Sequence, residues 1–174
     1  MTNLGLIQVY TGTGKGKTTA SLGLAFRACG HGFKVCMIQF MKQCADASEV
    51  KAAQFIPGFK IVQVGREEFV DLKNPSPKDV STAHDGWELA KSTIESGDYD
   101  IVILDEINVA MACGLLDTSE VVSFLTAKKR QVEIVLTGRY VPDTIVAIAH
   151  LVTELQEIKH PYQQGIDARQ GIDY

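Results

Sequence analysis

The chain has 174 residues, and 45% of them are hydrophobic, which is enough apolar material for one globular domain with a buried core. Its formal net charge is −4 at pH 7, so it lacks the overall positive field that attracts a nucleic-acid backbone, and we expect no nucleic-acid partner. No stretch reaches the roughly 18 apolar residues of a membrane span, and the N-terminus lacks a signal-peptide pattern, so we expect no membrane association and a cytoplasmic location.

Short apolar segments alternate with longer helical patterns along the chain. Several of these segments are nearly continuous in Val, Ile and Leu, which indicates strands that are buried on both faces, as in a parallel sheet. The expected strands are 4–10, 34–40, 60–64, 100–106, 132–138 and 150–158.

Helical patterns with recognisable ends lie between the expected strands. The first ends at a glycine signal around His31, and the second begins with Ser76 as N-cap and Pro77 at the first helical position. The expected helices are 17–29, 77–96, 117–129 and 142–149. This alternation predicts a single α/β domain over residues 1–174, a mostly parallel sheet of about six strands with helices on both faces.

The segment TGTGKGKTT, residues 11–19, lies between the first expected strand and the first expected helix, which is the context of a phosphate-binding loop. Glycines let backbone N–H groups turn toward an anion, and the helix N-terminus adds partial positive charge. Lys17 can reach terminal phosphate oxygens, and Thr18 can offer its hydroxyl to Mg²⁺. The usual pattern has a glycine where this chain has Thr11. The expected nucleotide-binding residues of the loop are Gly12, Thr13, Gly14, Lys15, Gly16, Lys17, Thr18 and Thr19.

Acidic residues follow the apolar strand IVIL, where Asp105 and Glu106 emerge at the carboxyl end. Ligands of an open α/β sheet collect at that edge, and a carboxylate there can hold Mg²⁺ directly or through water. The segment LTGR places Thr137 and Arg139 near the same edge, where Arg139 can contact a nucleotide phosphate or a second substrate. The sequence therefore predicts a magnesium–nucleotide site.

Cysteine and histidine spacing points to no further chemistry. None of the four cysteines forms a C-x-x-C pair or a zinc pattern with histidine, so we expect free thiols. None of the four histidines is expected to be catalytic.

A magnesium–nucleotide site leaves several reactions open. These are phosphoryl transfer by a small-molecule kinase or ATPase, a mechanical or DNA-acting ATPase, and transfer of another part of ATP. The acidic charge and the short chain disfavour action on DNA, and the scattered arginines do not form a kinase-type lid. A scaffold that uses nucleotide only as a switch is a further alternative.

Five stretches together resemble the P-loop type of ATP:corrinoid adenosyltransferase, in the same order and over nearly the whole chain. The matching stretches are YTGTGKGKTTA (10–20), GHGFKVCMIQFMK (30–42), IVILDEI (101–107), IVLTGR (134–139) and LVTELQEIKHPYQQGIDARQGIDY (151–174). The resemblance implies a RecA-like fold and, usually, a homodimer. It also implies transfer of the 5′-deoxyadenosyl group of ATP to the cobalt of a reduced corrinoid, with release of triphosphate, in the synthesis of cobalamin (vitamin B12).

The same resemblance assigns roles to individual residues. Gly12 through Thr18 would hold the phosphates, with Lys17 and Thr18 at their centre, and threonine at the first loop position is normal in the family. Thr18 and Glu106 would contact Mg²⁺, with Asp105 in support. The Co(I) centre of a reduced corrinoid is itself a strong nucleophile, so no general base is expected to activate it.

The family reduces Co(II) with the help of aromatic side chains that displace the lower axial ligand, and a flavoprotein is the expected electron donor. The matching segment here is VGREEFVDL, residues 64–72, in which Phe69 is the candidate corrinoid contact. This chain departs from the family pattern there, because Arg66 rather than an aromatic residue follows the glycine. The sole tryptophan, Trp87, lies on an expected helix and is expected in the core.

Overall fold

The computed structural model describes residues 4–44, 46–68 and 70–173. Its strands are β1 (Ile7–Thr11), β2 (Val35–Phe40), β3 (Phe59–Val64), β4 (Ile101–Asp105), β5 (Glu133–Thr137) and β6 (Leu151–Glu154). Its α-helices are α1 (Lys17–Gly30), α2 (Ser48–Ala53), α3 (Pro77–Ser96), α4 (Ile107–Ala112), α5 (Thr118–Ala127) and α6 (Asp143–Ile148), and a 3₁₀ helix, η1, spans Pro161–Gln164. The predicted alternation of strands and helices is confirmed.

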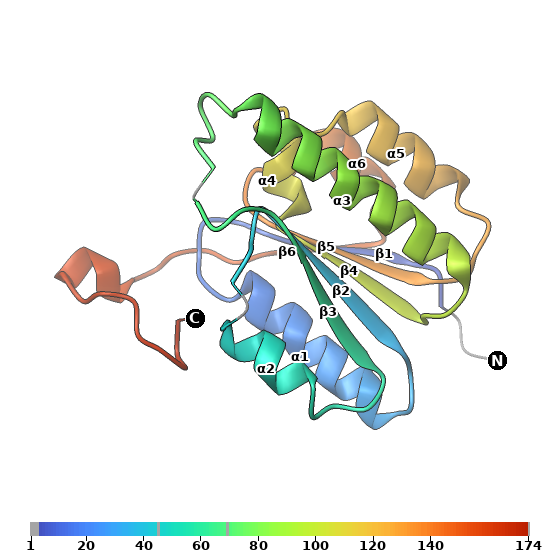
Figure 1. Ribbon diagram of the computed structural model, residues 1–174, viewed down its shortest axis with the longest axis horizontal. Helices are drawn as coiled ribbons and strands as arrows, with labels where there is room; N and C mark the ends of the chain where they lie inside the picture. The colour runs from blue at the N-terminus through green and yellow to red at the C-terminus, as the bar shows by residue number, and fades with distance from the viewer. Residues whose placement is uncertain (1–3, 45, 69, 174) are drawn as a thin grey trace.

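The strands form one sheet in the order β3-β2-β4-β5-β1-β6, and all their pairings are parallel. Helices α1 and α2 cover one face and α3 to α6 cover the other, as Figure 1 shows. This arrangement is an α/β fold consistent with a RecA-like P-loop domain. All strands therefore end at the same edge, which brings the loops that follow them together.

Two hydrophobic clusters hold the layers together, one on each face of the sheet. Successive side chains of β2 alternate between them, with Cys36 and Ile38 in one cluster and Val35 and Met37 in the other. All six residues of β2 are buried, as its continuous apolarity predicted. Trp87 is fully buried on α3, as expected, and its Nε1 donates to Glu120 Oε1 at 2.8 Å.

Helix α3 begins where the sequence indicated. The Ser76 side chain accepts a hydrogen bond from the Asp79 backbone N–H, the Asp79 carboxylate accepts one from the Ser76 backbone N–H, and Pro77 is the first helical residue. This capping box satisfies two backbone donors that the first turn leaves without intrahelical partners.

One strand end and two helices differ clearly from the prediction. The last strand ends at Glu154 rather than at residue 158, and α2 and α4 were not predicted. Five of the six residues of α4 are buried, so its sequence continues the apolar run of β4 and lacks the polar face that reveals a helix. None of the helices in the described part of the chain combines the length and apolar character that crossing a membrane requires.

Two helical glycines provide a matched test of the packing between α3 and the sheet. A Cβ added to Gly86 would lie 2.7 Å from Val64 Cγ2 and 3.1 Å from Phe40 Cε1, whereas one added to Gly23 of α1 meets nothing within 4 Å. Gly86→Ala is therefore expected to lower the free energy of unfolding by about 1–3 kcal/mol through overpacking. Gly23→Ala should raise it by up to about 1 kcal/mol through helix propensity. Urea unfolding of both variants measures the two changes, and a stabilised Gly86→Ala protein would contradict this packing.

Candidate active site

The glycine-rich loop connects the end of β1 to the start of α1. Gly12 and Gly16 have φ angles of 99° and 117°, in the region that favours glycine. A Cβ on Gly12 would lie 2.3 Å from the carbonyl oxygen of Leu155, and the Gly14 N–H donates to the same oxygen at 2.7 Å. The chain that follows β6 thus packs directly on the loop, and it requires glycine there.

Thr11 is the buried last residue of β1, opposite Glu154 of β6. Its carbonyl oxygen accepts the Leu155 N–H at 2.8 Å. Its backbone is not among the left-handed non-glycine positions of the described residues, so the first loop position does not need a glycine in this fold.

Lys17 is a buried residue at the start of α1. Its Nζ donates to the carbonyl oxygens of Gly12 and Gly14 at 2.9 and 2.7 Å, so the ammonium lies inside the curve of the loop. Burial lowers the pKa of this ammonium, whereas the nearby charge of Glu106 opposes that change. The predicted phosphate lysine is therefore held where an anion bound by the loop would meet it.

Asp105 is fully buried at the end of β4 and joins three of the neighbouring segments. Its Oδ1 accepts hydrogen bonds from Thr18 Oγ1 at 2.9 Å and from Thr137 Oγ1 at 2.6 Å. Its Oδ2 accepts from Lys42 Nζ at 2.9 Å and from Gln39 Nε2 at 3.2 Å. The structure thus brings the predicted residues of the first loop, β4 and β5 into contact.

Glu106 has a left-handed backbone, with φ of 64°, and caps the N-terminus of α4. Burial raises the pKa of its carboxyl, and the charge of Asp105 raises it further, while Lys42 and Lys17 act in the opposite direction. Within the described residues no hydrogen bond to this carboxylate is formed. Its oxygens therefore remain available to a ligand, although Lys17, Lys42 and Arg139 already act on its charge.

The donors at this edge suit Mg²⁺, which prefers oxygen ligands and commonly combines one or two protein groups with substrate phosphates and water. The Thr18 hydroxyl and the Glu106 carboxylate supply such oxygens, whereas both oxygens of Asp105 already accept hydrogen bonds. In the described part of the chain no group of three or more His, Cys, Asp and Glu side chains gathers to hold a metal by itself. The residues therefore fit a cation whose remaining ligands come from a bound phosphate.

Arg139 follows β5, and its charge acts on both Lys17 and Glu106: it adds to the burial that lowers the pKa of Lys17, and it opposes the burial that raises the pKa of Glu106. The preceding Gly138 has φ of 127°, and its carbonyl oxygen accepts a hydrogen bond from Asn108 Nδ2 at 3.3 Å. Asn108 is fully buried, and its Oδ1 has no partner among the described residues. Sequence reasoning missed Asn108, since it stands inside an apolar run.

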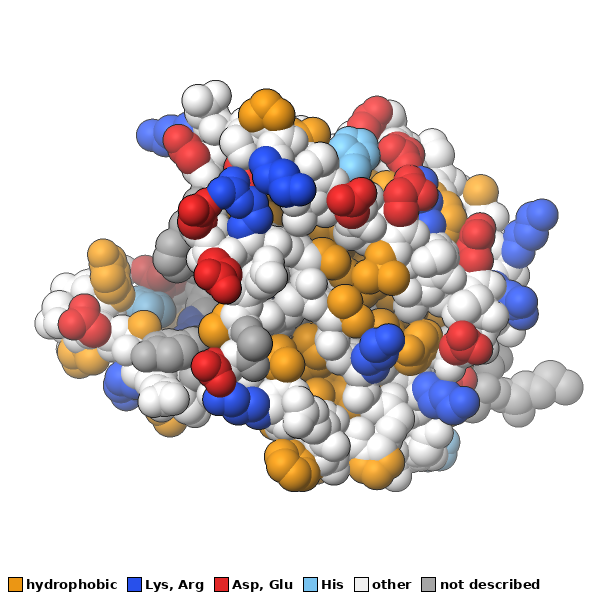
Figure 2. Space-filling model, in the orientation of Figure 1, with side chains coloured by type: hydrophobic (Ala, Val, Ile, Leu, Met, Phe, Trp, Pro, Cys, Tyr) orange, Lys and Arg blue, Asp and Glu red, His pale blue; other side chains and the backbone are white. Residues whose placement is uncertain are grey.

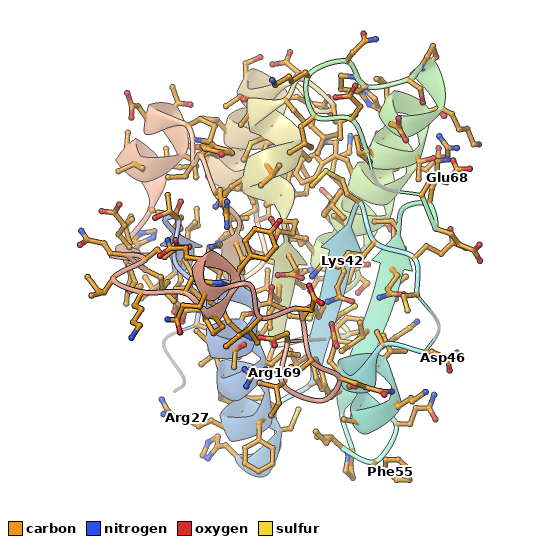
Figure 3. All side chains as sticks on the ribbon, turned by 90° about the vertical axis from the view of Figure 1, so that its left-hand side faces the viewer. Arg27, Lys42, Asp46, Phe55, Glu68 and Arg169 are labelled. Carbon is orange, nitrogen blue, oxygen red and sulfur yellow. The ribbon has the colours of Figure 1, made fainter. Side chains whose placement is uncertain are left out.

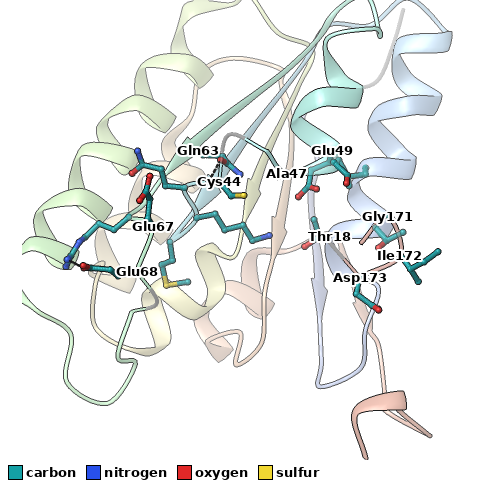
Figure 4. A pocket seen from close by; sticks show the side chains of 17 residues that line it. Thr18, Cys44, Ala47, Glu49, Gln63, Glu67, Glu68, Gly171, Ile172 and Asp173 are labelled. Atoms are coloured by element: carbon teal, nitrogen blue, oxygen red, sulfur yellow. Dashed lines mark hydrogen bonds and ion pairs between the residues drawn. The ribbon is translucent and has the colours of Figure 1, made fainter. Parts of the chain in front are cut away.

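A pocket of about 540 Å³ opens beside Thr18. Its walls come from the start of α1, the β2–α2 and β3–α3 connections and residues 171–173. Figure 4 shows Glu67 and Glu68 on one side of it and Gly171, Ile172 and Asp173 on the other. The segment with Arg66, Glu67 and Glu68 is the one that contains Phe69, and Phe69 itself lies outside the described residues.

The tail after β6 extends past this edge and turns back toward the start of α1 (Figure 1). Lys15 Nζ forms an ion pair with the Asp173 carboxylate and donates to the Ile172 carbonyl oxygen at 3.0 Å. Lys15, predicted as a nucleotide contact, is thus directed toward the tail, whereas Lys17 remains in the loop. Nothing local in the sequence links residues 15 and 173.

Lys42 lines the pocket beside Thr18 and forms an ion pair with Asp105, and in the view of Figure 3 it appears between Arg169 of the tail and Glu68 of the β3–α3 connection. Sequence reasoning missed the role of Lys42. It follows the end of β2, and the rule that ligands collect at the carboxyl ends of parallel strands, which was applied to Asp105, would have indicated it.

The four cysteines are free thiols, as expected. On the face shown in Figure 2, acidic and basic side chains are interspersed and form no broad basic surface.

Comparison with known proteins covers nearly the whole chain. Residues 3–174 match the family model described as ATP:corrinoid adenosyltransferase BtuR/CobO/CobP. A corrinoid adenosyltransferase of Sinorhizobium sp is 38% identical over 173 residues, which cover 98% of this chain and 80% of that protein. A corrinoid adenosyltransferase of Escherichia coli (strain K12) is 36% identical over 170 residues, which cover 98% of this chain and 86% of that protein. One of Pseudomonas aeruginosa is 31% identical over 170 residues, which cover 98% of this chain and 84% of that protein.

Proposed function

The chain belongs to the ATP:corrinoid adenosyltransferase family, and from this premise we propose that residues 1–174 are one catalytic domain that holds MgATP by its triphosphate. The enzyme transfers an adenosyl group from ATP to a corrinoid. The observation that carries the site assignment is the hydrogen bond of 2.9 Å between Thr18 of the glycine loop and Asp105 of β4. It joins the phosphate cradle to the acidic edge of the sheet.

The proposed reaction needs orientation and charge stabilisation rather than a base. The Co(I) electron pair forms the bond to C5′ of ATP, and the C5′–O bond breaks with its electron pair going to the triphosphate oxygen. No proton has to be removed in this step, so the reaction needs no catalytic histidine. The protein must align cobalt and C5′ and stabilise the charge that develops on the triphosphate.

The loop residues Gly12, Thr13, Gly14, Lys15, Gly16, Lys17, Thr18 and Thr19 are the proposed ATP contacts, together with Arg139. Lys17 supplies positive charge inside the loop, and α1 directs its N-terminus at the same place. Thr18 and Glu106 are the proposed Mg²⁺ contacts, and Asp105 positions the Thr18 hydroxyl. When bound, Mg²⁺ neutralises charge on the triphosphate.

The corrinoid is proposed to enter the pocket of about 540 Å³ beside Thr18, because this is the space next to the triphosphate site. Phe69 is the proposed group that displaces the lower axial ligand, since its neighbours Glu67 and Glu68 line the pocket. From the family we also propose a homodimer, a cytoplasmic location and a flavoprotein that reduces the corrinoid.

The function is tested by incubating the enzyme with MgATP and chemically reduced cob(I)alamin in the dark. The absorption spectrum should change to that of a light-sensitive adenosylated product. Release of ADP and phosphate without dependence on a corrinoid would contradict this function and favour the alternative, a P-loop kinase or ATPase that acts on another small molecule.

A further inference from the structure

The chain is sharply turned where β2 ends, and this turn places Lys42. Met41 has a left-handed φ of 57°, and its N–H donates to the Val64 carbonyl oxygen at 2.9 Å. A Cβ on Gly65 would lie 2.3 Å from the Lys42 backbone nitrogen, so two connections pass each other in contact. The backbone of Lys42 is therefore fixed, and its side chain returns to the sheet edge.

The Lys42 ammonium forms an ion pair with a carboxylate that is completely buried. Nζ lies 2.9 Å from Asp105 Oδ2, and the Lys42 side chain is 33% exposed while that of Asp105 is 0% exposed. Burial lowers the pKa of Lys42, but the charge and hydrogen bond of Asp105 together with the charges of Glu106 and Glu49 outweigh burial, so the pKa is raised. Lys42 also lines the pocket, so one side chain contacts both the acidic edge and the proposed substrate space.

A chain of amide groups holds the same carboxylate from the side of β2 and β3. Gln39 Nε2 donates to Asp105 Oδ2 at 3.2 Å, and Gln63 Nε2 donates to Gln39 Oε1 at 2.9 Å. Gln63 Oε1 in turn accepts the Cys44 N–H at 2.8 Å. The position of Asp105 and that of the β2–α2 connection are thus linked by direct hydrogen bonds.

Charges around the acidic edge balance only when Lys42 is counted. The carboxylates of Asp105, Glu106 and Glu49 all act on Lys42, and Gln39 Nε2 donates to Glu49 Oε1 at 3.3 Å. Lys17, Lys42 and Arg139 act on Glu106 as positive charges, so three carboxylates stand against three cations. A balanced site gives a lone cation little net attraction, whereas a cation that arrives with a polyanion brings its own counter-charge; without Lys42 the site would carry excess negative charge and attract a cation by itself.

We propose that Lys42 is the built-in counter-cation of the Asp105–Glu106 pair, which positions Asp105 toward Thr18 and makes the site accept Mg²⁺ together with the triphosphate rather than Mg²⁺ alone. Lys42 is a positioning residue in this role, because it acts through Asp105. The inference rests on the proposed function for the identities of the cation and of the triphosphate.

Thermal unfolding of the full chain tests this role without ATP or corrinoid, so its result does not depend on whether adenosyl transfer occurs. Lys42→Met should lower the unfolding midpoint in EDTA by about 5–10 °C, because it leaves a buried carboxylate unpaired. Magnesium chloride should then raise the midpoint of Lys42→Met clearly more than that of the parent chain, because a bound cation stabilises the folded state. Lys51→Met is the matched control, since Lys51 pairs with the exposed Asp46 and should respond like the parent chain.

A double variant separates the lost charge from the lost aliphatic stem. Lys42→Met combined with Asp105→Asn should recover much of the midpoint, since no unpaired carboxylate remains, and this comparison also applies if Lys42→Met alone fails to fold. The inference is overturned if Lys42→Met unfolds at the parent midpoint in EDTA. It is equally overturned if Mg²⁺ stabilises the variant and the parent alike, or if the double variant shows no recovery.

Discussion

Lys17→Ala is expected to lower kcat for adenosyl transfer by at least about 10²–10³-fold, the loss typical when one group that stabilises transition-state charge is removed. The Lys17 ammonium lies inside the loop, bonded to the carbonyl oxygens of Gly12 and Gly14. Its charge is therefore placed where negative charge develops on the departing triphosphate. Steady-state kinetics with saturating MgATP and cob(I)alamin measures the effect.

Lys78→Ala is the matched control, because Lys78 is an exposed residue on the first turn of α3, remote in the sequence from the loop. It removes the same charge and stem and should leave kcat unchanged. Retention of near-parental activity by Lys17→Ala would show that the loop does not act on the triphosphate.

Glu106→Gln is expected to weaken the use of Mg²⁺ while it stabilises the protein in EDTA. An amide is a poorer Mg²⁺ ligand than a carboxylate, so the Mg²⁺ concentration for half-maximal activity should rise by about 10–100-fold. Since folding raises the pKa of Glu106, the ionised carboxylate costs stability at neutral pH, and this cost is relieved only as the pH falls through that raised pKa. The neutral glutamine removes it, so the unfolding midpoint in EDTA should rise.

The two readouts separate a metal contact from a purely structural residue. Glu95→Gln, on an exposed part of α3, is the control and should change neither quantity. A Glu106→Gln enzyme with the parental Mg²⁺ dependence would remove Glu106 from the proposed metal contacts.

Much of the fold could be predicted because the signals are local. Continuous apolarity of β2 and β4 indicated strands buried on both faces, and the Ser76 cap with Pro77 located the start of α3. Helix α4 was missed, since a helix buried on nearly all sides has no polar stripe. The last strand was predicted too long, because the segment from Leu155 onward leaves the sheet to pack on the glycine loop.

The candidate site was predictable where one rule, that ligands collect at the carboxyl edge of a parallel sheet, brings distant residues together. The rule placed Asp105, Thr18 and Thr137 near one another, and the structure joins them by hydrogen bonds. Pairings such as Lys15 with Asp173 depend on how the tail folds over the loop, and no local pattern encodes them. The roles of the remaining predicted contacts stay predictions.

The glycines of the loop illustrate this difference between local and long-range causes. Their spacing indicated a phosphate cradle, but the contact distances show a second requirement, since the carbonyl oxygen of Leu155 and the backbone of Gln156 leave no room for a Cβ at Gly12 or Gly14. Thr11 needs no such freedom, because it is still part of β1.

The phosphorus product of a single dark turnover tests the central claim most directly. The enzyme is mixed with MgATP and an equal amount of cob(I)alamin, and the products are identified by phosphorus NMR. If the bond that breaks is at C5′, intact triphosphate appears in the same amount as the adenosylated corrinoid. Formation of ADP and phosphate instead of triphosphate would contradict the account.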